Sequence, residues 1–201
     1  MLEVVKIDIK KFYPSTTSLH IYKYFHEEML CSSDVAGLIT KLLTYDNHIP
    51  TGSCVSQQIA FLVHKGMFDE MQALSIHHGI TMTCYVDDIT FSASDIPAAF
   101  LNDIKKIIRK TGLKHHKERR YTKIRPKLIT GVIVTDTGIR VRNKLLMKIH
   151  DGFESLRAAV KSGEEVKLDS LLGRINAANE ISGDFTGMKR RAKRYEELKV
   201  D

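Results

Sequence analysis

Apolar and polar residues alternate near the start of the chain. Val5, Ile7 and Ile9 are separated by Lys6 and Asp8. A period of two predicts a β-strand with one buried and one polar face. Asp8 lies on the polar face, so we expect its carboxylate to point away from the core. Because a domain rarely opens on a core strand, we also expect a preceding segment to be missing or to be supplied by another chain.

Spacings of three or four positions between apolar residues predict helices in the regions that follow. Such spacing occurs over residues 12–30, 33–43, 59–79 and 96–112, and the third region predicts one long buried helix. Between the last two of these regions, two β-rich runs meet at Asp87 and Asp88. This pattern predicts a hairpin with both aspartates at or beside its turn.

The remaining third of the chain predicts further strands and then helices. Residues 127–135 and 138–142 have the composition of a second strand pair, and the chain is mostly helical from about residue 143. Strands interleaved with helices, without a regular βαβ series, predict an α+β fold. We expect its sheet to be covered on one face by helices.

Composition excludes several classes of protein. A chain of 201 residues that is 43% apolar can bury one sizeable core. It contains no apolar run long enough to span a membrane and no signal-peptide pattern. The three cysteines are odd in number and lack metal-ligand spacing, so they predict reduced thiols in a cytoplasmic protein.

Positive charge is concentrated in one part of the chain. The whole sequence has 31 Lys and Arg against 24 Asp and Glu, a net charge of +7. Between residues 103 and 148, 15 basic residues face only three acids, an excess of 12. This density favours contacts with the phosphates of a nucleic acid over a solvated surface.

The aspartates are the candidate chemistry. If Asp8 on the first strand lies beside Asp87 and Asp88 of the hairpin, the three carboxylates can hold hard cations through oxygen ligands alone. Two such ions would serve a phosphoryl displacement by contacting both the attacking and the leaving oxygen. From spacing alone, a surface aspartate and an ordinary Asp-Asp turn explain the same pattern.

Three motifs occur in a fixed order around these aspartates. They are D-x-x-x-F-Y-P-S from Asp8, P-T-G-S-x-x-S-Q from Pro50, and Y-V-D-D ending at Asp88. In this order they resemble motifs A, B and C of the reverse transcriptase palm. Residues 112–120 are similar to motif D and residues 128–134 to the primer-grip strand. The ITG before an apolar strand and the TFSAS after YVDD look most like a bacterial retron reverse transcriptase.

The resemblance implies an architecture. Residues 1–142 would form a polymerase right-hand palm, an antiparallel sheet backed by helices. Residues 143–201 would form a helical, thumb-like basic region.

The resemblance also implies roles for individual residues. Asp8, Asp87 and Asp88 would be catalytic and would bind two Mg²⁺ ions. Tyr13 would exclude a ribose 2′-hydroxyl. Nucleotide binding would involve Ile9, Lys10, Lys11, Phe12, Tyr13, Thr51, Gly52 and Arg119. Primer and template binding would involve Thr130, Gly131, Lys144 and Arg174.

Some positions depart from the family pattern. Thr51 stands where many reverse transcriptases have Gln. Gln57 replaces a frequent Pro, and a Gln at this position is similar to the reverse transcriptases of diversity-generating retroelements. Arg119 stands where motif D has a Lys, and an Arg is a poor proton donor. In the family a basic fingers region precedes motif A. We therefore expect that another chain or an RNA completes the active site, that the chain is a fragment, or that it is a degraded palm.

The resemblance implies an RNA-directed DNA polymerase that extends a primer with deoxynucleoside triphosphates. Its template would be a structured non-coding RNA, its product an RNA/DNA hybrid, and its setting anti-phage defence. A second chain that supplies the fingers, or an effector protein, is a further expected partner, and no membrane is involved. The alternatives are a diversity-generating or abortive-infection reverse transcriptase and a non-catalytic, palm-derived RNA-binding subunit.

Overall fold

The computed structural model describes residues 2–162 and 168–197 and divides into two compact units, Met1–Ile124 and Arg125–Asp201. The first unit ends before residue 142, the palm boundary predicted from the sequence. The difference arises because the strands that follow Ile124 pair with one another and contact the C-terminal helices. The boundary between palm and thumb-like regions stays a prediction about function.

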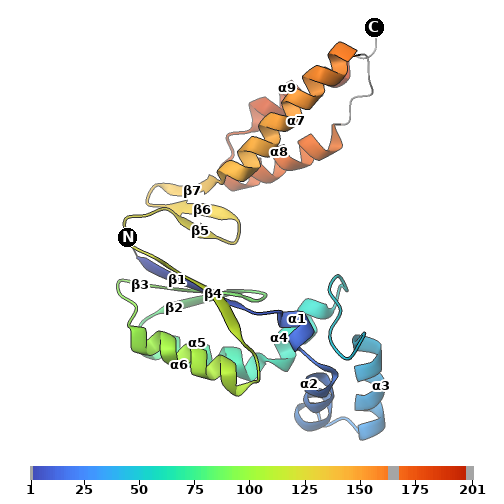
Figure 1. Cartoon of the computed structure of the whole chain (residues 1–201), viewed down its shortest axis with the longest axis vertical. Coiled ribbons are helices and arrows are strands. Elements are labelled where there is room, and N and C mark those ends of the chain that lie inside the picture. The colour runs from blue at the N-terminus through green and yellow to red at the C-terminus, as the bar shows by residue number, and fades with distance from the viewer. Residues whose placement is uncertain (1, 163–167, 198–201) are drawn as a thin grey trace. The chain divides into compact units, whose positions relative to one another are not determined.

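A four-stranded antiparallel sheet forms the centre of the first unit (Figure 1). Its strands are β1 (Glu3–Ile9), β2 (Thr81–Tyr85), β3 (Asp88–Ala93) and β4 (His115–Tyr121), in the order β2-β3-β1-β4. The predicted first strand and the predicted hairpin are both present. The sequence did not predict β4.

Alternation along the central strands gives the sheet one apolar face. Val5, Ile7 and Ile9 of β1 are fully buried, as are Ile89 and Phe91 opposite them on β3. Two helices, α5 (Lys65–His77) and α6 (Ala98–Lys110), cover this face. They contribute the large buried side chains Met71, Phe100, Ile104 and Ile108. The other face of the sheet is polar, and it carries the candidate chemistry.

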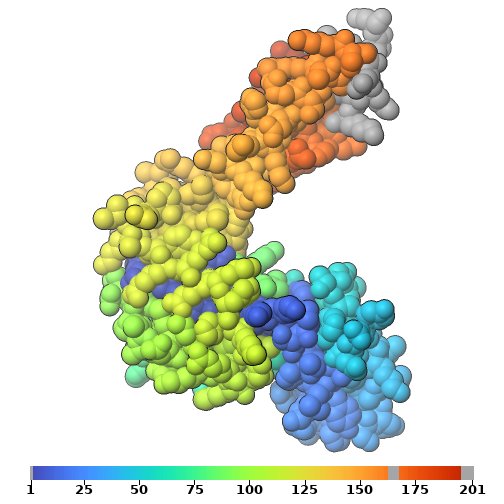
Figure 2. Space-filling view, viewed as in Figure 1, coloured from blue at the N-terminus to red at the C-terminus, as the bar shows by residue number. Residues whose placement is uncertain are grey.

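Shorter helices connect β1 to α5, and two of the helix predictions are wrong in detail. Residues 12–30 form α1 (Phe12–Ser15), α2 (Ser18–Lys23) and the π-helix η1 (Tyr24–Glu28) in place of one helix. The chain breaks at Thr16, whose extended backbone ends α1. Then α3 (Ser33–Leu43) follows as predicted, and Figure 2 shows α2 and α3, in blue, at the molecular surface.

The helix predicted over 59–79 is also divided. It forms α4 (Ser56–Val63) and α5, which meet at His64. His64 is buried, and its Nε2 lies 3.1 Å from the Thr16 hydroxyl. This tertiary contact fixes His64 in a non-helical conformation, with φ −105° and ψ 14°.

The second unit pairs a small sheet with three helices. Its strands are β5 (Lys127–Ile129), β6 (Val132–Thr135) and β7 (Gly138–Val141), and its helices are α7 (Asn143–Ser162), α8 (Asp169–Ser182) and α9 (Thr186–Glu197). The helices share a core that includes Ile149, Phe153, Leu171 and Ile175. In the part of the chain that the structure describes, no helix is long and apolar enough to cross a bilayer.

The single strand predicted over 127–135 is wrong. The chain reverses at Thr130 and Gly131, which have φ of 43° and 91°, so β5 and β6 form a hairpin. Glycine adopts such positive φ values freely, which favours a turn at this point.

Candidate active site

The pairing of β1 with β3 places two of the predicted aspartates opposite each other. In this antiparallel register Asp8 is the direct partner of Asp88. Directly opposed residues of an antiparallel pair project from the same face of the sheet. Both carboxylates therefore belong to the polar face, as the alternation around Asp8 predicts.

The third aspartate lies in the tight turn between β2 and β3. Val86 adopts a left-handed conformation, with φ of 59°, and the chain then passes through Asp87 into β3. The Ile9 backbone N–H donates to the Asp87 carbonyl at 2.9 Å, which fastens the turn to the end of β1. The hairpin and the first strand are thus joined where the aspartates lie.

The three carboxylates are close enough to influence one another. Burial raises the pKa of Asp87 above its usual value, and the negative charges of Asp8 and Asp88 raise it further. His116 acts in the opposite direction. A concentration of carboxylates of this kind favours a bound cation.

Two basic side chains next to the aspartates were not predicted as site residues. Lys6 forms an ion pair with Asp88 through Oδ2, and His116 Nδ1 lies 3.0 Å from Asp8 Oδ1. Alternation along β1 could have identified Lys6, which is two positions before Asp8. The position of His116 depends on the pairing of β4 with β1, which the sequence does not indicate.

The donor chemistry of the site fits magnesium. Asp88 Oδ1 is buried and has no hydrogen-bond partner, although Lys6 contacts the other oxygen of the same carboxylate. Carboxylate oxygens are the ligands that Mg²⁺ prefers. Among the described residues, no group of three or more acidic, His or Cys side chains is already arranged around one point. In this arrangement Lys6 and His116 are the groups positioned to balance the carboxylate charge.

The residues after Asp8 divide into buried and accessible ones. Ile9 and Phe12 are buried, and the Phe12 ring packs 5.5 Å from the His64 ring. Their side chains belong to the core, so only their backbone can contact a nucleotide. Lys10 and Lys11 are exposed.

Tyr13, in motif A, lies close enough to Asp87 to be influenced by its charge. Burial raises the pKa of its hydroxyl, and negative charge on Asp87 and Tyr85 raises it further. The ring is half-buried, and it packs against the core at Phe12 with ring centroids 5.9 Å apart. A rigidly packed ring in this position is suited to a steric role.

The motif B residues lie in an exposed loop before α4. Gly52 has φ of 95°, a conformation that favours glycine, and a Cβ on it would meet nothing within 4 Å. The Ser56 hydroxyl closes the loop by donating to the Pro50 carbonyl at 2.7 Å. Thr51 is exposed beside Gly52. Arg119 is exposed on β4, directly opposite Lys6 of β1.

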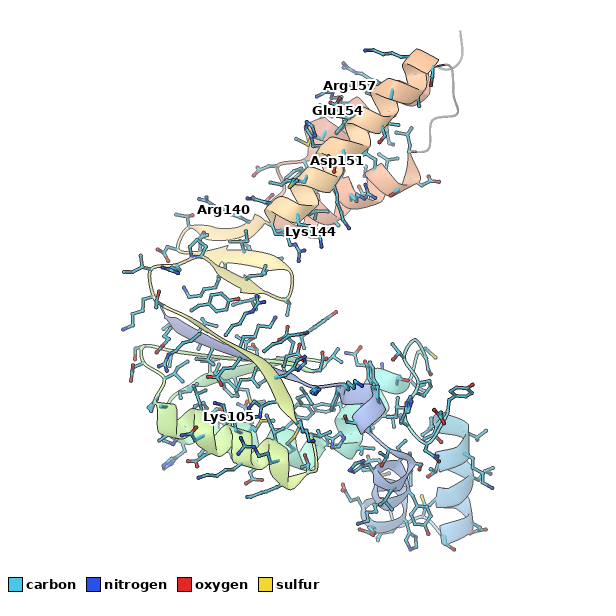
Figure 3. The ribbon with its side chains drawn as sticks, in the orientation of Figure 1. Lys105, Arg140, Lys144, Asp151, Glu154 and Arg157 are labelled. Carbon is cyan, nitrogen blue, oxygen red and sulfur yellow. The ribbon has the colours of Figure 1, made fainter. Side chains whose placement is uncertain are left out.

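The four predicted primer and template residues belong to the second unit. Thr130 and Gly131 form the β5–β6 turn, and Lys144 lies near the start of α7 (Figure 3). Arg174 of α8 donates to the Lys148 carbonyl at 3.0 Å. Their role in binding nucleic acid stays a prediction.

Removal of the Asp87 charge is expected to stabilise the metal-free chain. Because the pKa of Asp87 is raised in the folded state, this state binds more protons than the unfolded one, and stability falls as pH rises from about 3.8 through the raised value. We expect Asp87→Asn to raise the melting temperature at pH 7 by about 1–3 °C. The gain should disappear below the usual pKa of an aspartate.

Calorimetry in EDTA at pH 7 and pH 3.5 tests this expectation. Asp69→Asn is the matched control, because Asp69 is exposed and forms only a surface ion pair with Lys65. A lower melting temperature for Asp87→Asn at pH 7 would contradict the expectation that the ionised Asp87 carboxylate destabilises the folded chain.

Comparisons with known proteins find partial similarity to reverse transcriptases. The chain is 28% identical over 93 residues to the retron Ec86 reverse transcriptase of Escherichia coli, which covers 46% of this chain and 29% of that protein. It is 31% identical over 94 residues to the retron Se72 reverse transcriptase of Salmonella heidelberg (strain 579083-10), covering 45% and 24%. The aligned region is thus less than a third of either relative. The similarity confirms the resemblance to retron reverse transcriptases found from the motifs. No family model matches the chain.

Solved structures share the fold at low identity. A foamy viral protease-reverse transcriptase in complex with double-stranded DNA aligns with 96% of this chain and 30% of its own, at a TM-score of 0.58 and 15% identity. Telomerase from Candida albicans, in complex with a fragment of telomeric RNA, aligns with 100% of this chain and 46% of its own. The TM-score is 0.54 and the sequence identity is 11%. Truncated apo telomerase from Candida tropicalis aligns with 70% of this chain and 35% of its own, at a TM-score of 0.52 and 11% identity. These likenesses confirm the predicted α+β palm fold.

Proposed function

We propose that this chain is part of an RNA-directed DNA polymerase of the retron type. The observation that carries the proposal is the register of β1 and β3, which sets Asp8 opposite Asp88 and brings the Asp87 turn against the end of β1. Similarity to two retron reverse transcriptases supports the same assignment. The reaction would be the addition of deoxynucleotides to a primer on an RNA template.

Each residue of the site would have a distinct task. Asp8 and Asp87 would hold two Mg²⁺ ions through their carboxylates, and Asp88 would assist through its unpartnered Oδ1. Mg²⁺ held by these carboxylates would supply Lewis-acid chemistry, lowering the pKa of the primer 3′-hydroxyl and offsetting the charge that develops at the α-phosphate. Lys6 would balance the charge of Asp88. Tyr13 would exclude ribonucleotides by the bulk of its ring.

The expected nucleic-acid partner is a structured non-coding RNA of the bacterial cytoplasm, with an RNA/DNA hybrid as product. The excess of basic residues between 103 and 148 supplies phosphate contacts. An A-form hybrid is recognised by its shape, its phosphates and its 2′-hydroxyls more than by its sequence. The biological role would be anti-phage defence, together with an effector protein or a fingers-supplying chain.

Primer extension tests the proposal. The native chain is incubated with an RNA template, a labelled primer and deoxynucleotides, with Mg²⁺ or with EDTA, and with or without the neighbouring proteins of its genomic locus. Template-dependent extension that stops in EDTA is the expected result. If sequencing of the product finds random or homopolymeric DNA, the diversity-generating or abortive-infection alternative replaces the retron assignment.

One observation favours a second candidate, a non-catalytic RNA-binding subunit. Lys6 already neutralises Asp88, so a palm can keep this carboxylate without a metal ion. In that case RNA binding and biological activity would both survive replacement of Asp87 and Asp88 by Ala. Loss of activity with retained RNA binding would exclude this candidate.

A further inference from the structure

Exposed apolar side chains gather around α3 of the first unit. Within residues 29–45, six large apolar side chains are exposed: Met29, Leu30, Val35, Leu38, Leu42 and Tyr45. Single exposed apolar side chains are common on protein surfaces, whereas a group of them marks an interaction site. None of the residues assigned to the candidate active site lies in this segment. The proposed function therefore does not explain why these side chains face solvent.

Three of these side chains form a regular stripe along α3. Val35, Leu38 and Leu42 are separated by three and four positions, so they share one face of the helix. Ala36 and Thr40, on the other side, are buried, and α3 packs there against α2 and η1 (Figure 1). The described part of the first unit leaves the face of Val35, Leu38 and Leu42 uncovered, and we call it the α3 stripe.

One acidic and one basic side chain flank the α3 stripe. Asp34 and Lys41 are exposed, and neither forms an ion pair with another residue that the structure describes. Seven residues make nearly two helical turns, so both lie on the same flank of the stripe. A hydrogen bond from the Ser32 hydroxyl, together with backbone N–H groups, lowers the pKa of Asp34. Its carboxylate is therefore charged at neutral pH.

The order of these side chains is complementary to itself when the helix direction is reversed. A second copy of α3, antiparallel to the first and centred on Leu38, sets Val35 of each copy against Leu42 of the other. The same alignment sets Asp34 of each copy against Lys41 of the other, as a two-fold axis requires. A parallel alignment would instead bring like charges together. The charge pattern thus selects a second copy in the antiparallel direction.

The two ends of α3 agree with this alignment. Leu30 before the helix and Tyr45 after it are mostly exposed, and they lie at nearly equal distances from Leu38 in the sequence. The backbone of Leu30 is left-handed, with φ of 56°, which is uncommon for a bulky side chain. Antiparallel pairing would bring the Leu30 end of one copy to the Tyr45 end of the other, which extends the apolar contact beyond the helices.

We propose that the α3 stripe joins two copies of this chain in an antiparallel, two-fold symmetric pair. Two short helices and their ends bury an area at the low end of specific interfaces, so the dissociation constant is expected on the order of 10 µM. The stripe contains no residue of the candidate active site, so the pairing does not depend on the proposed polymerase activity.

Sedimentation velocity of the nucleic-acid-free chain, between about 1 and 200 µM, tests the proposal. A reversible equilibrium between monomer and dimer is the expected result. Leu38→Lys should weaken the dimer at least about tenfold, because it places two ammonium groups next to each other at the two-fold axis. Ile76→Lys is the matched control, since Ile76 of α5 is 67% exposed and Leu38 is 60% exposed. This control should dimerise within about twofold of the native chain.

Charge reversal tests the antiparallel alignment. Asp34→Lys and Lys41→Asp should each weaken the dimer at least about tenfold, because each sets like charges opposite each other at both ends of the pair. An equimolar mixture of these two variants should dimerise again, because every facing pair then has opposite charges. Recovery in the mixture also shows that each variant is folded.

Three results would overturn the proposal. The first is a native chain that stays monomeric over the whole range, which would leave the stripe to a different partner. The second is a dimer that Leu38→Lys leaves intact, which would place the contact elsewhere. The third is loss of the dimer in both charge variants with no recovery in their mixture, which would contradict the antiparallel alignment.

Discussion

Replacement of Asp8 or Asp87 by Ala is expected to abolish primer extension and to leave RNA affinity nearly unchanged. Both carboxylates lie where β1 meets the β2–β3 turn, and neither is part of the apolar core. Loss of a principal metal ligand removes several kcal/mol of transition-state stabilisation, so we expect activity to fall about 10³-fold or more. Single-turnover extension and RNA titration of the same preparations measure the two quantities.

Controls separate chemistry from folding. Asp88→Ala should have a smaller effect, because Lys6 already engages that carboxylate. Asp69→Ala changes an exposed aspartate on α5 and should leave extension unchanged. A loss of RNA affinity in Asp8→Ala as large as the loss of extension would argue against a metal-ligand role.

Under the proposed function, Tyr13→Ala is expected to let the chain incorporate ribonucleotides. The half-buried ring packs beside Phe12 and is close enough to Asp87 for the charge of that aspartate to raise its pKa. Removal of the ring would open space where we propose that the incoming sugar binds. We expect the preference for deoxynucleotides to fall on the order of tenfold to a hundredfold, measured as the ratio of kcat/KM values.

The hydroxyl and the ring of Tyr13 can be tested separately. Tyr13→Phe keeps the ring and should keep sugar discrimination. Tyr45→Ala removes an exposed tyrosine of the same unit and serves as the control. If Tyr13→Ala discriminates as well as the native chain, the steric role belongs to another residue.

Three strands of the central sheet, β1, β2 and β3, could be predicted because each carries its own pattern. Alternation in β1 and the β-rich runs around Asp87 indicate strands before any partner is known. Strand β4 has the sequence HHKERRY, which contains no apolar alternation. It forms because it pairs with β1, an interaction between distant residues that local sequence does not report.

The helix breaks and the neighbours of the aspartates also depend on contacts between residues that are far apart in the sequence. His64 interrupts a continuous helical pattern because its ring is buried against Thr16, which lies far away in the sequence. The three aspartates were found from motifs in sequence order. Their neighbours Lys6 and His116 are defined by strand register and ion pairing, and His116 becomes visible only when β4 is placed.

Because side chains of β1 alternate between the two faces of the sheet, the site depends on the number of residues in the strand being kept. Substitutions on the polar face change single contacts, whereas insertion of one residue between Val5 and Asp8 would exchange the two faces of the strand end. Asp8 would then enter the core beneath α6, and a buried isoleucine would face the other aspartates. Insertion of two residues would restore the facing of every side chain. Strand β1 can therefore tolerate substitutions on its polar face more readily than the insertion of a single residue.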